Sequence, residues 1–178
     1  KSNVQQIART YQLAYPQARI LFPNTKDFTP SNRFRLFREM TFNDWDCIIM
    51  THDQFRKIPN SPEIQKQIFQ EELSHVEKDL ETVRELGGRI SKAMVKGLEI
   101  RKNNLINTLS QIKQQMDHQK DENLDFESIG IDHLFVDESH AFKNLTFTTR
   151  HKNVAGLGNT KGSQKALNML FAVRSLQD

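Results

Sequence analysis

The stretch "LFVDESHAF", Leu134–Phe142, runs from apolar residues straight into two acids, a serine and a histidine. Short apolar runs of this kind are typical of strands covered on both faces of a parallel sheet. Ligands of such sheets bind beyond the carboxyl ends of the strands, where Asp137 could hold Mg²⁺ through its water shell. Glu138 could then orient and deprotonate an attacking water, and His140 could link nucleotide state to neighbouring segments. The alternative is that the acids merely end a strand, as polar residues commonly do.

Outward from this stretch, the flanking sequence alternates predicted helices and strands. Apolar residues at helical spacing predict a helix over 4–14, with Pro16 as its stop, and another over Ser31–Met40. Brief apolar runs predict three strands, at Arg19–Phe22, Asp46–Met50 and Asp132–Val136. This rhythm favours an α/β fold with a doubly wound parallel sheet.

The middle of the chain breaks that rhythm. Apolar residues spaced mostly by threes and fours predict two long amphipathic helices, Pro62–Leu86 and Ile90–Met116, joined at Gly87-Gly88. They would form an antiparallel helical hairpin. The hairpin is either a structural insertion with a coiled-coil-like seam or a protruding arm for DNA or a protein partner, and its mixed charges permit both interpretations.

The predicted organisation is therefore a core interrupted by an insertion. Residues 1–61 would form the first part of the core, 62–120 the helical hairpin insertion, and 121–178 the second part with the Asp-Glu pair. The chain begins Lys1-Ser2-Asn3 without methionine and stops inside a predicted helix. We therefore expect it to be a piece of a larger protein.

Composition narrows the class of protein and the partners. Of 178 residues, 37% are hydrophobic and 26% charged, which is enough to bury a core. Lys and Arg number 25 against 22 acids, a net charge of +3, which weakly favours an anionic partner. The single cysteine, Cys47, excludes an intrachain disulfide, fits a reducing compartment and is expected to be a small buried hydrophobe. No apolar run approaches the roughly 20 residues of a membrane span, and no signal peptide is evident, so no membrane partner is expected.

A basic, glycine-bearing segment follows the Asp-Glu pair. Lys143, Arg150 and Lys152 lie in or beside "KNLTFTTRHKNVAGLGNTKGSQKA". Such a segment could touch nucleic-acid phosphates or a nucleotide. It could equally be an ordinary solvated loop.

Several stretches, in order, resemble the helicases and translocases of superfamily 2. "VDESH" is similar to their motif II, the Asp-Glu-x-His box of DEAD/DEAH-type enzymes. "KSNVQQIARTYQLAYPQARILF" resembles the segment after motif Ia in the chromatin-remodeller-like branch, and "DWDCIIMTHDQFRKIP" the strand and turn that follow. "GIDHLFVDESHAFKNL" with "NVAGLGNTKGSQKALNM" looks most like Strawberry notch-related helicases, as in large helicase–DNA methyltransferase proteins of bacterial mobile elements and phages.

The resemblance implies the first RecA-like domain, a parallel-sheet fold, of a two-domain ATP-driven motor acting on DNA. In that family Asp137 would coordinate Mg²⁺–ATP, Glu138 would be the catalytic base, and His140 would couple hydrolysis to DNA contacts. Its partners would be ATP, DNA and the second RecA-like domain of the same parent chain. The expected location is the cytoplasm of a bacterium or of a host carrying a phage or mobile element.

The resemblance also implies positions near DNA. Lys1 and Ser2, if they belong to motif Ia, would lie near the DNA backbone. Thr51 and His52 would lie at the next DNA-facing loop. Thr51 could instead cap a helix that follows the second strand.

The chain departs from the family pattern at two places. It contains no Gly-x-x-x-x-Gly-Lys-Ser/Thr phosphate loop and no recognisable motif III. The chain by itself is therefore expected neither to bind ATP tightly nor to hydrolyse it, because little would stabilise the transition-state charge. Two other functions stay open: a non-helicase P-loop ATPase, and a protein-interaction or DNA-binding module built on the hairpin.

Overall fold

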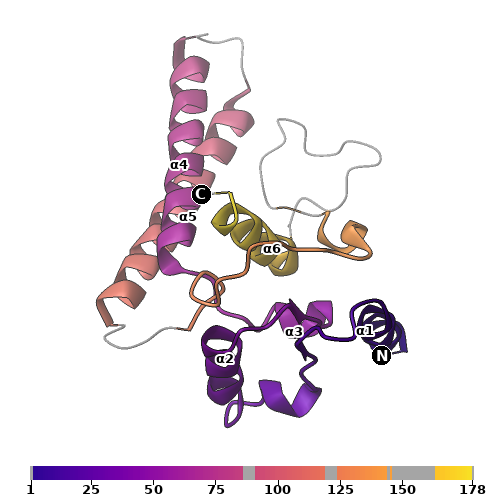
Figure 1. Ribbon diagram of the computed structural model, residues 1–178. Helices are drawn as coiled ribbons and strands as arrows, with labels where there is room; N and C mark the ends of the chain where they lie inside the picture. Colours follow the sequence, from indigo (N-terminus) through magenta and orange to yellow (C-terminus); the bar gives the residue numbers. More distant parts are fainter. Residues whose placement is uncertain (1, 86–90, 119–123, 144, 146–162, 178) are drawn as a thin grey trace. The chain divides into compact units, whose positions relative to one another are not determined.

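The computed structural model describes residues 2–85, 91–118, 124–143, 145 and 163–177 (Figure 1). The chain forms two compact units. The first combines Lys1–Asn60 with Asn123–Asp178, and the second is Ser61–Glu122. None of the described helices is both long and apolar enough to cross a lipid bilayer.

The first unit contains two short strands that pair in parallel. β1 (Ile20–Leu21) and β2 (Cys47–Ile48) align Ile20 with Cys47 and Leu21 with Ile48. Both lie within predicted strands. This pair is the whole of the sheet in the described residues, which are otherwise mainly helical or irregular.

The expected RecA-like parallel sheet is wrong for this structure. The predicted third strand, Asp132–Val136, pairs with no other segment among the described residues, and Phe135 within it is 93% exposed. A strand inside a parallel sheet must be covered on both faces and must share its backbone hydrogen bonds with neighbours. Segment 132–136 is not covered on both faces and shares no ladder of backbone hydrogen bonds with another described strand. Its apolar residues therefore do not indicate a buried strand.

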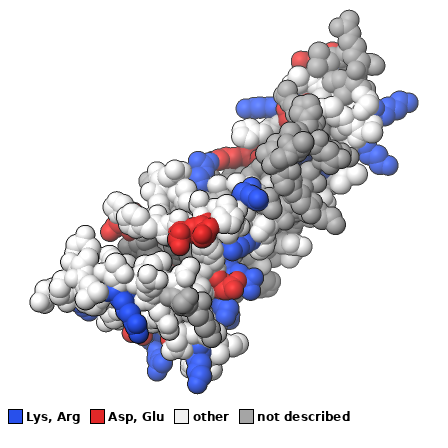
Figure 2. Space-filling view, turned by 90° about the vertical axis from the view of Figure 1, so that its right-hand side faces the viewer, with Lys and Arg blue, Asp and Glu red and all other residues white. Residues whose placement is uncertain are grey.

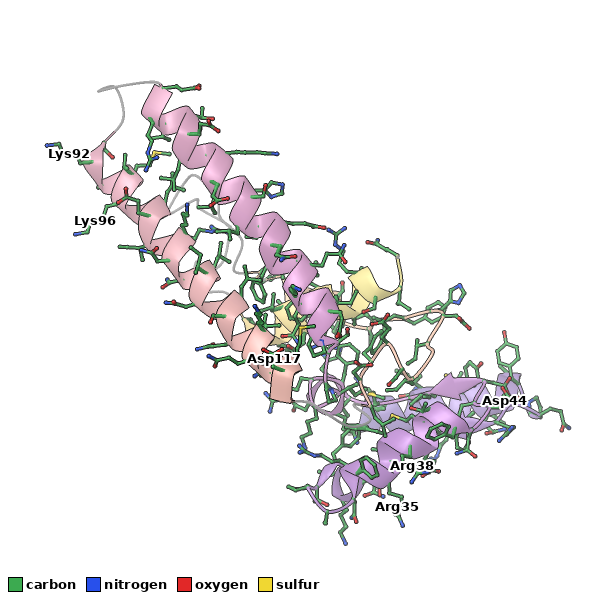
Figure 3. All side chains as sticks on the ribbon, turned by 90° about the vertical axis from the view of Figure 1, so that its left-hand side faces the viewer. Arg35, Arg38, Asp44, Lys92, Lys96 and Asp117 are labelled. Carbon is green, nitrogen blue, oxygen red and sulfur yellow. The ribbon has the colours of Figure 1, made fainter. Side chains whose placement is uncertain are left out.

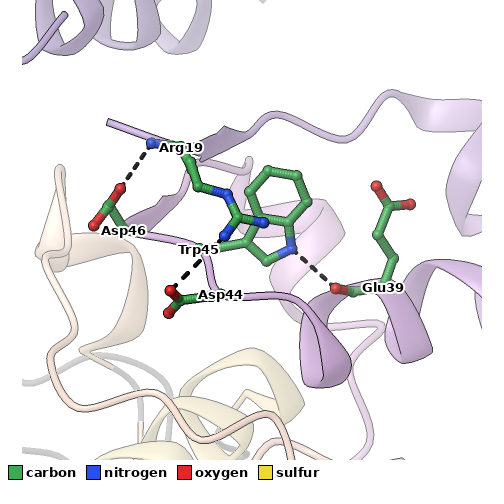
Figure 4. A network of polar contacts seen from close by, with 5 residues as sticks. All are labelled: Arg19, Glu39, Asp44, Trp45 and Asp46. Carbon is green, nitrogen blue, oxygen red and sulfur yellow. Dashed lines mark hydrogen bonds and ion pairs between the residues drawn. The ribbon is translucent and has the colours of Figure 1, made fainter. Parts of the chain in front are cut away.

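A polar network fixes the entry to the strand pair (Figure 4). The backbone N–H of Arg19 donates to Asp46 Oδ2 at 2.7 Å, and the Arg19 guanidinium lies 3.8 Å from Asp44. The same guanidinium lies 5.6 Å from the Trp45 ring centroid, and the indole N–H donates to the Glu39 carbonyl at 2.9 Å. These contacts join residues before β1, the end of α2 and the start of β2, and so set the register of the pair.

Helices and 3₁₀ turns precede and follow each of the two strands along the sequence. α1 (Ser2–Ala14) precedes β1 and a 3₁₀ turn, η1 (Thr25–Phe28), follows it. α2 (Arg33–Phe42) starts two residues later than predicted, with Asn32 at its N-cap. α3 (His52–Phe55), η2 (Ser139–Phe142) and α6 (Gln164–Ser175) complete the unit.

An apolar cluster holds the first unit together across its break in sequence. Its buried members come from β1, η1, α2, the turn after α3 and residues beyond the insertion: Leu21, Phe28, Leu36, Phe37, Met40, Ile58, Phe126, Ile129 and Ala172. The N–H of Phe126 also donates to the Pro59 carbonyl at 2.9 Å. The two chain segments on either side of the insertion therefore share one core.

The second unit consists of two long helices that pack side by side (Figure 1). α4 (Pro62–Glu85) and α5 (Lys92–His118) match the amphipathic helices predicted from spacing. The predicted Gly87-Gly88 turn lies outside the described residues. On α5 the buried Leu98, Leu105 and Ile112 recur every seven residues, the repeat of a coiled-coil seam.

Charged pairs join the two helices beside that seam. Arg101 and Glu72 form an ion pair with side chains only 20% and 16% exposed. Lys102 Nζ lies 2.8 Å from Glu77 Oε1. Partly desolvated pairs of this kind specify the register of helices more than they add stability.

Candidate functional site

A left-handed residue shapes the predicted Asp-Glu site. Glu138 has φ 53° and ψ 45°, and it is the only non-glycine residue with positive φ among those described. At this point the extended segment turns into η2, and the Ala141 N–H donates to the Glu138 carbonyl at 3.0 Å. The Asp137 carboxylate accepts from the Glu138 N–H at 2.9 Å, which braces the turn. Strained backbone of this kind is found preferentially at functional sites.

The side chains of Glu138 and His140 form a pair beside that turn. Glu138 Oε2 lies 2.9 Å from His140 Nδ1, so an N–H on Nδ1 donates to the carboxylate. The two side chains are 67% and 72% exposed. The structure therefore places Asp137, Glu138 and His140, which are close in sequence, in one exposed turn.

His52 joins this site from another part of the sequence. Its Nε2 lies 3.0 Å from the Asp137 carbonyl oxygen, 85 residues further along the chain. A carbonyl can only accept, so this contact requires a proton on Nε2. The His52 ring also packs edge-on against Phe142, with centroids 4.7 Å apart.

Thr51 holds His52 in place by capping α3. Its hydroxyl accepts from the Gln54 N–H at 3.2 Å, and the Gln54 side chain accepts from the Thr51 N–H at 2.8 Å. The capping alternative for Thr51 is therefore what the structure shows. Gln54 is itself buried and donates to the Pro23 carbonyl at 2.9 Å, so the turn that carries His52 is anchored to the strand pair.

α6 contributes a cation to the same neighbourhood. Lys165 Nζ lies 4.9 Å from the ring centroid of Phe142, a residue that is only 9% exposed. Lys143, exposed, ends η2. Sequence reasoning predicted Lys143 but not the roles of Phe142 and Lys165, because residues so far apart carry no common local pattern.

The other predicted nucleic-acid contacts cannot be placed. Lys1, Arg150 and Lys152 lie outside the described residues. Ser2 is the first residue of α1, and its side chain is likewise outside the description.

An open cavity of about 510 Å³ adjoins Asp137. Residues of α1 line it, including Ile7, Thr10 and Tyr11. Asp137, far away in the sequence, is another lining residue. Desolvation raises the pKa of the Tyr11 hydroxyl, and Cys47 and Asp46 raise it further. Helical periodicity could have defined this face of α1, but nothing in the sequence indicates that it meets Asp137.

The residues present suit a hydrated magnesium ion held with a nucleotide. Among the described residues, no three His, Cys, Asp or Glu side chains gather closely enough to hold a metal. Mg²⁺ keeps several waters and is commonly bound by one or two carboxylates plus substrate phosphates. A single carboxylate at Asp137 is compatible with that mode and not with a metal site made by the protein alone.

Comparison with known families identifies the class. A family described as "Probable helicase domain" matches residues 1–178, the whole chain. No curated protein sequence and no solved structure matches it. The chain belongs to this family of helicase domains, which confirms the helicase class predicted from motif II.

Proposed function

We propose that this chain is part of an ATP-dependent DNA helicase or translocase whose nucleotide site includes Asp137, Glu138 and His140. The observation that carries the proposal is the exposed Asp-Glu-Ser-His turn, in which the Asp137 carboxylate accepts from the Glu138 N–H and the Glu138 carboxylate contacts His140. Membership of a helicase family supports the same chemistry. The bound Mg²⁺–ATP would supply the phosphoanhydride bond whose hydrolysis drives movement on DNA.

Each residue of the turn has a distinct role in this proposal. The Asp137 carboxylate holds the hydrated cation. The Glu138 carboxylate accepts a proton from the attacking water, and His140 orients it through the 2.9 Å contact. Because His52 contacts the Asp137 carbonyl, a displacement of α3 on DNA binding would be felt at the site.

The finer family assignment is also part of the proposal. The motifs quoted above support superfamily 2 and the Strawberry notch-related branch found in helicase–methyltransferase proteins. A second motor domain would complete the ATP site, and the setting would be bacterial cytoplasm. Because the sequence has no phosphate loop, residues 1–178 alone should show no robust ATP turnover.

Substitution of Glu138 in the longer parent protein tests the catalytic role. Glu138→Gln should preserve ATP binding and reduce turnover by about 10²- to 10⁴-fold, the usual contribution of a general base. Glu127→Gln is the matched control, since Glu127 is an exposed glutamate of the same unit. Unchanged turnover in Glu138→Gln would disprove the assignment.

A second candidate function concerns the helical hairpin. α5 leaves Ile100 52% and Ile106 43% exposed. Exposed apolar residues on a long helix suit a protein-interaction arm. Deleting 62–120 from the parent would support this function if ATPase activity survives while a partner is lost, and would oppose it if every interaction survives.

A further inference from the structure

α2 presents a face whose composition differs from the rest of the unit. Phe34 and Phe42 are 52% and 67% exposed, and Arg35 and Arg38 are exposed as well. At 3.6 residues per turn, Phe34, Arg35, Arg38 and Phe42 fall within an arc of about 100°. We call these four residues the α2 basic–aromatic face. Figure 3 shows Arg35 and Arg38 along α2.

This face lies opposite the part of α2 that enters the core. Leu36, Phe37 and Met40 are buried at 4%, 5% and 2% exposure. The helix therefore satisfies its amphipathic requirement without Phe34 and Phe42. Phe34 and Phe42 lie two turns apart on this face with Arg38 between them, and an exposed apolar patch rimmed by polar residues marks an interaction site.

Arg38 links the two phenylalanines. Its guanidinium carbon lies 6.0 Å from the Phe34 ring centroid and 5.6 Å from that of Phe42. The spacing of four residues places the three side chains in one row, phenylalanine, guanidinium, phenylalanine. The row offers three flat surfaces in succession, each of which can stack on a nucleobase.

The positive charge of the face is not neutralised by its neighbours. None of the ion pairs among the described residues involves Arg35 or Arg38. Of the nearest acids in sequence, Asp44 pairs with Arg19, and the half-buried Glu39 belongs to none of the ion pairs among the described residues. Figure 2 shows that both basic and acidic side chains lie on the face of the molecule drawn there.

We propose that the α2 basic–aromatic face binds an unpaired stretch of nucleic acid. Phe34 and Phe42 stack on bases, while Arg35 and Arg38 pair with phosphates. The two phenylalanines are separated by about 12 Å along the helix axis, at 1.5 Å per residue. That is between three and four steps of about 3.4 Å along a strand, so the two rings contact bases several nucleotides apart. A duplex, whose bases present only their edges, does not fit.

The inference deepens the proposed function, because it names the form of nucleic acid and a contact surface outside the motifs. It rests on nucleic acid being the partner, but not on ATP hydrolysis. Binding is therefore measured without ATP. If oligonucleotide binding fails, the ATPase test at Glu138 is unaffected. If the ATPase test fails, the proposed nucleic-acid contact at α2 is unaffected.

The experiment is filter binding of a radiolabelled oligothymidylate to chain 1–178 at several salt concentrations. The double variant Phe34→Ala/Phe42→Ala should weaken binding by at least about 10-fold, since loss of one stacked base costs about 5- to 100-fold. Leu13→Ala, which removes another exposed apolar side chain (82% exposed), should leave binding unchanged. Calorimetry should show the same transition temperature for all variants, because these side chains are outside the core.

Arginine variants separate charge from stacking. Arg35→Ala should lower the slope of log affinity against log salt by about 0.7, the value for one phosphate contact on a single strand. Arg38→Lys keeps the charge and loses the flat guanidinium, so it should retain the slope and lose affinity. Arg33→Ala, on the same helix but outside the face, should leave the salt slope unchanged, because it removes no phosphate contact.

Three results would overturn the inference. The first is no binding of the oligonucleotide by the unmodified chain at low salt. The second is wild-type affinity in the Phe34→Ala/Phe42→Ala variant. The third is an equal loss in Leu13→Ala or Arg33→Ala, which would show that binding does not depend on the α2 basic–aromatic face.

Discussion

Replacement of Glu138 by glycine should stabilise the protein while abolishing its proposed catalysis. A non-glycine residue in the left-handed region costs about 1–2 kcal/mol. Glycine removes that cost. Its greater conformational freedom in the unfolded chain lowers the free energy of unfolding by about 0.5–1 kcal/mol, so the net stabilisation is about 0.5–1 kcal/mol. The lost contact to His140 subtracts little, because both side chains are more than half exposed.

Differential scanning calorimetry of chain 1–178 measures this gain. For a protein of this size, 1 kcal/mol corresponds to about 2–4 °C, so the transition of the unit that contains residue 138 should rise by about 1–4 °C. Glu138→Asn should also raise it, since asparagine tolerates the left-handed region. Glu127→Gly, at a residue with negative φ, should lower it by a similar amount.

A transition temperature for Glu138→Gly at or below that of the parent chain would refute the reasoning. It would mean that Glu138 is not held in the left-handed region in solution. A rise in stability together with lost turnover in the parent protein would instead identify strain maintained for function.

The remaining predictions concern packing, the hairpin and the thiol. Phe171→Ala, at a residue 1% exposed, should destabilise the first unit by about 3–5 kcal/mol in urea unfolding, and a loss below about 1 kcal/mol would contradict its burial. Glu72→Arg and Arg101→Glu should each destabilise the hairpin and should together recover at least about 1 kcal/mol in a double-mutant cycle; additive losses would mean that the ion pair is not formed. Burial, and then Asp46, raises the pKa of the Cys47 thiol, so less thiolate is present near neutral pH and alkylation by iodoacetamide should be slower than for a free cysteine until the pH rises. An alkylation rate of the native protein equal to that in denaturant would contradict this. Because the pKa of the Cys47 thiol is higher in the folded state than in the unfolded state, the free energy of unfolding should decline as the pH rises above the unfolded-state pKa.

Local sequence patterns correctly predicted the two long helices and the two paired strands. The spacing of apolar residues located α4 and α5, because an amphipathic helix carries its packing face in its own periodicity. The runs around β1 and β2 were also recognised. The strand predicted at 132–136 is wrong, since a short apolar run does not reveal whether neighbouring strands are present to pair with it.

The candidate site shows the same limit. Residue types alone pointed to Asp137, Glu138 and His140, and the structure brings these three together. The left-handed backbone of Glu138 has no sequence signature, because glutamate rarely adopts it. The contact between His52 and the Asp137 carbonyl joins residues 85 positions apart and depends on the tertiary fold.

The position of Trp45 allows the unfolding of the two units to be followed by different optical signals. It is the only tryptophan, it contacts Arg19 and Glu39 in the first unit, and residues 61–122 contain neither tryptophan nor tyrosine. Intrinsic fluorescence therefore reports on the first unit alone, whereas far-ultraviolet circular dichroism is weighted towards the long α4 and α5. Denaturation curves that coincide in both signals would show that the insertion and the core unfold as one cooperative system, and curves that separate would show that the hairpin folds on its own.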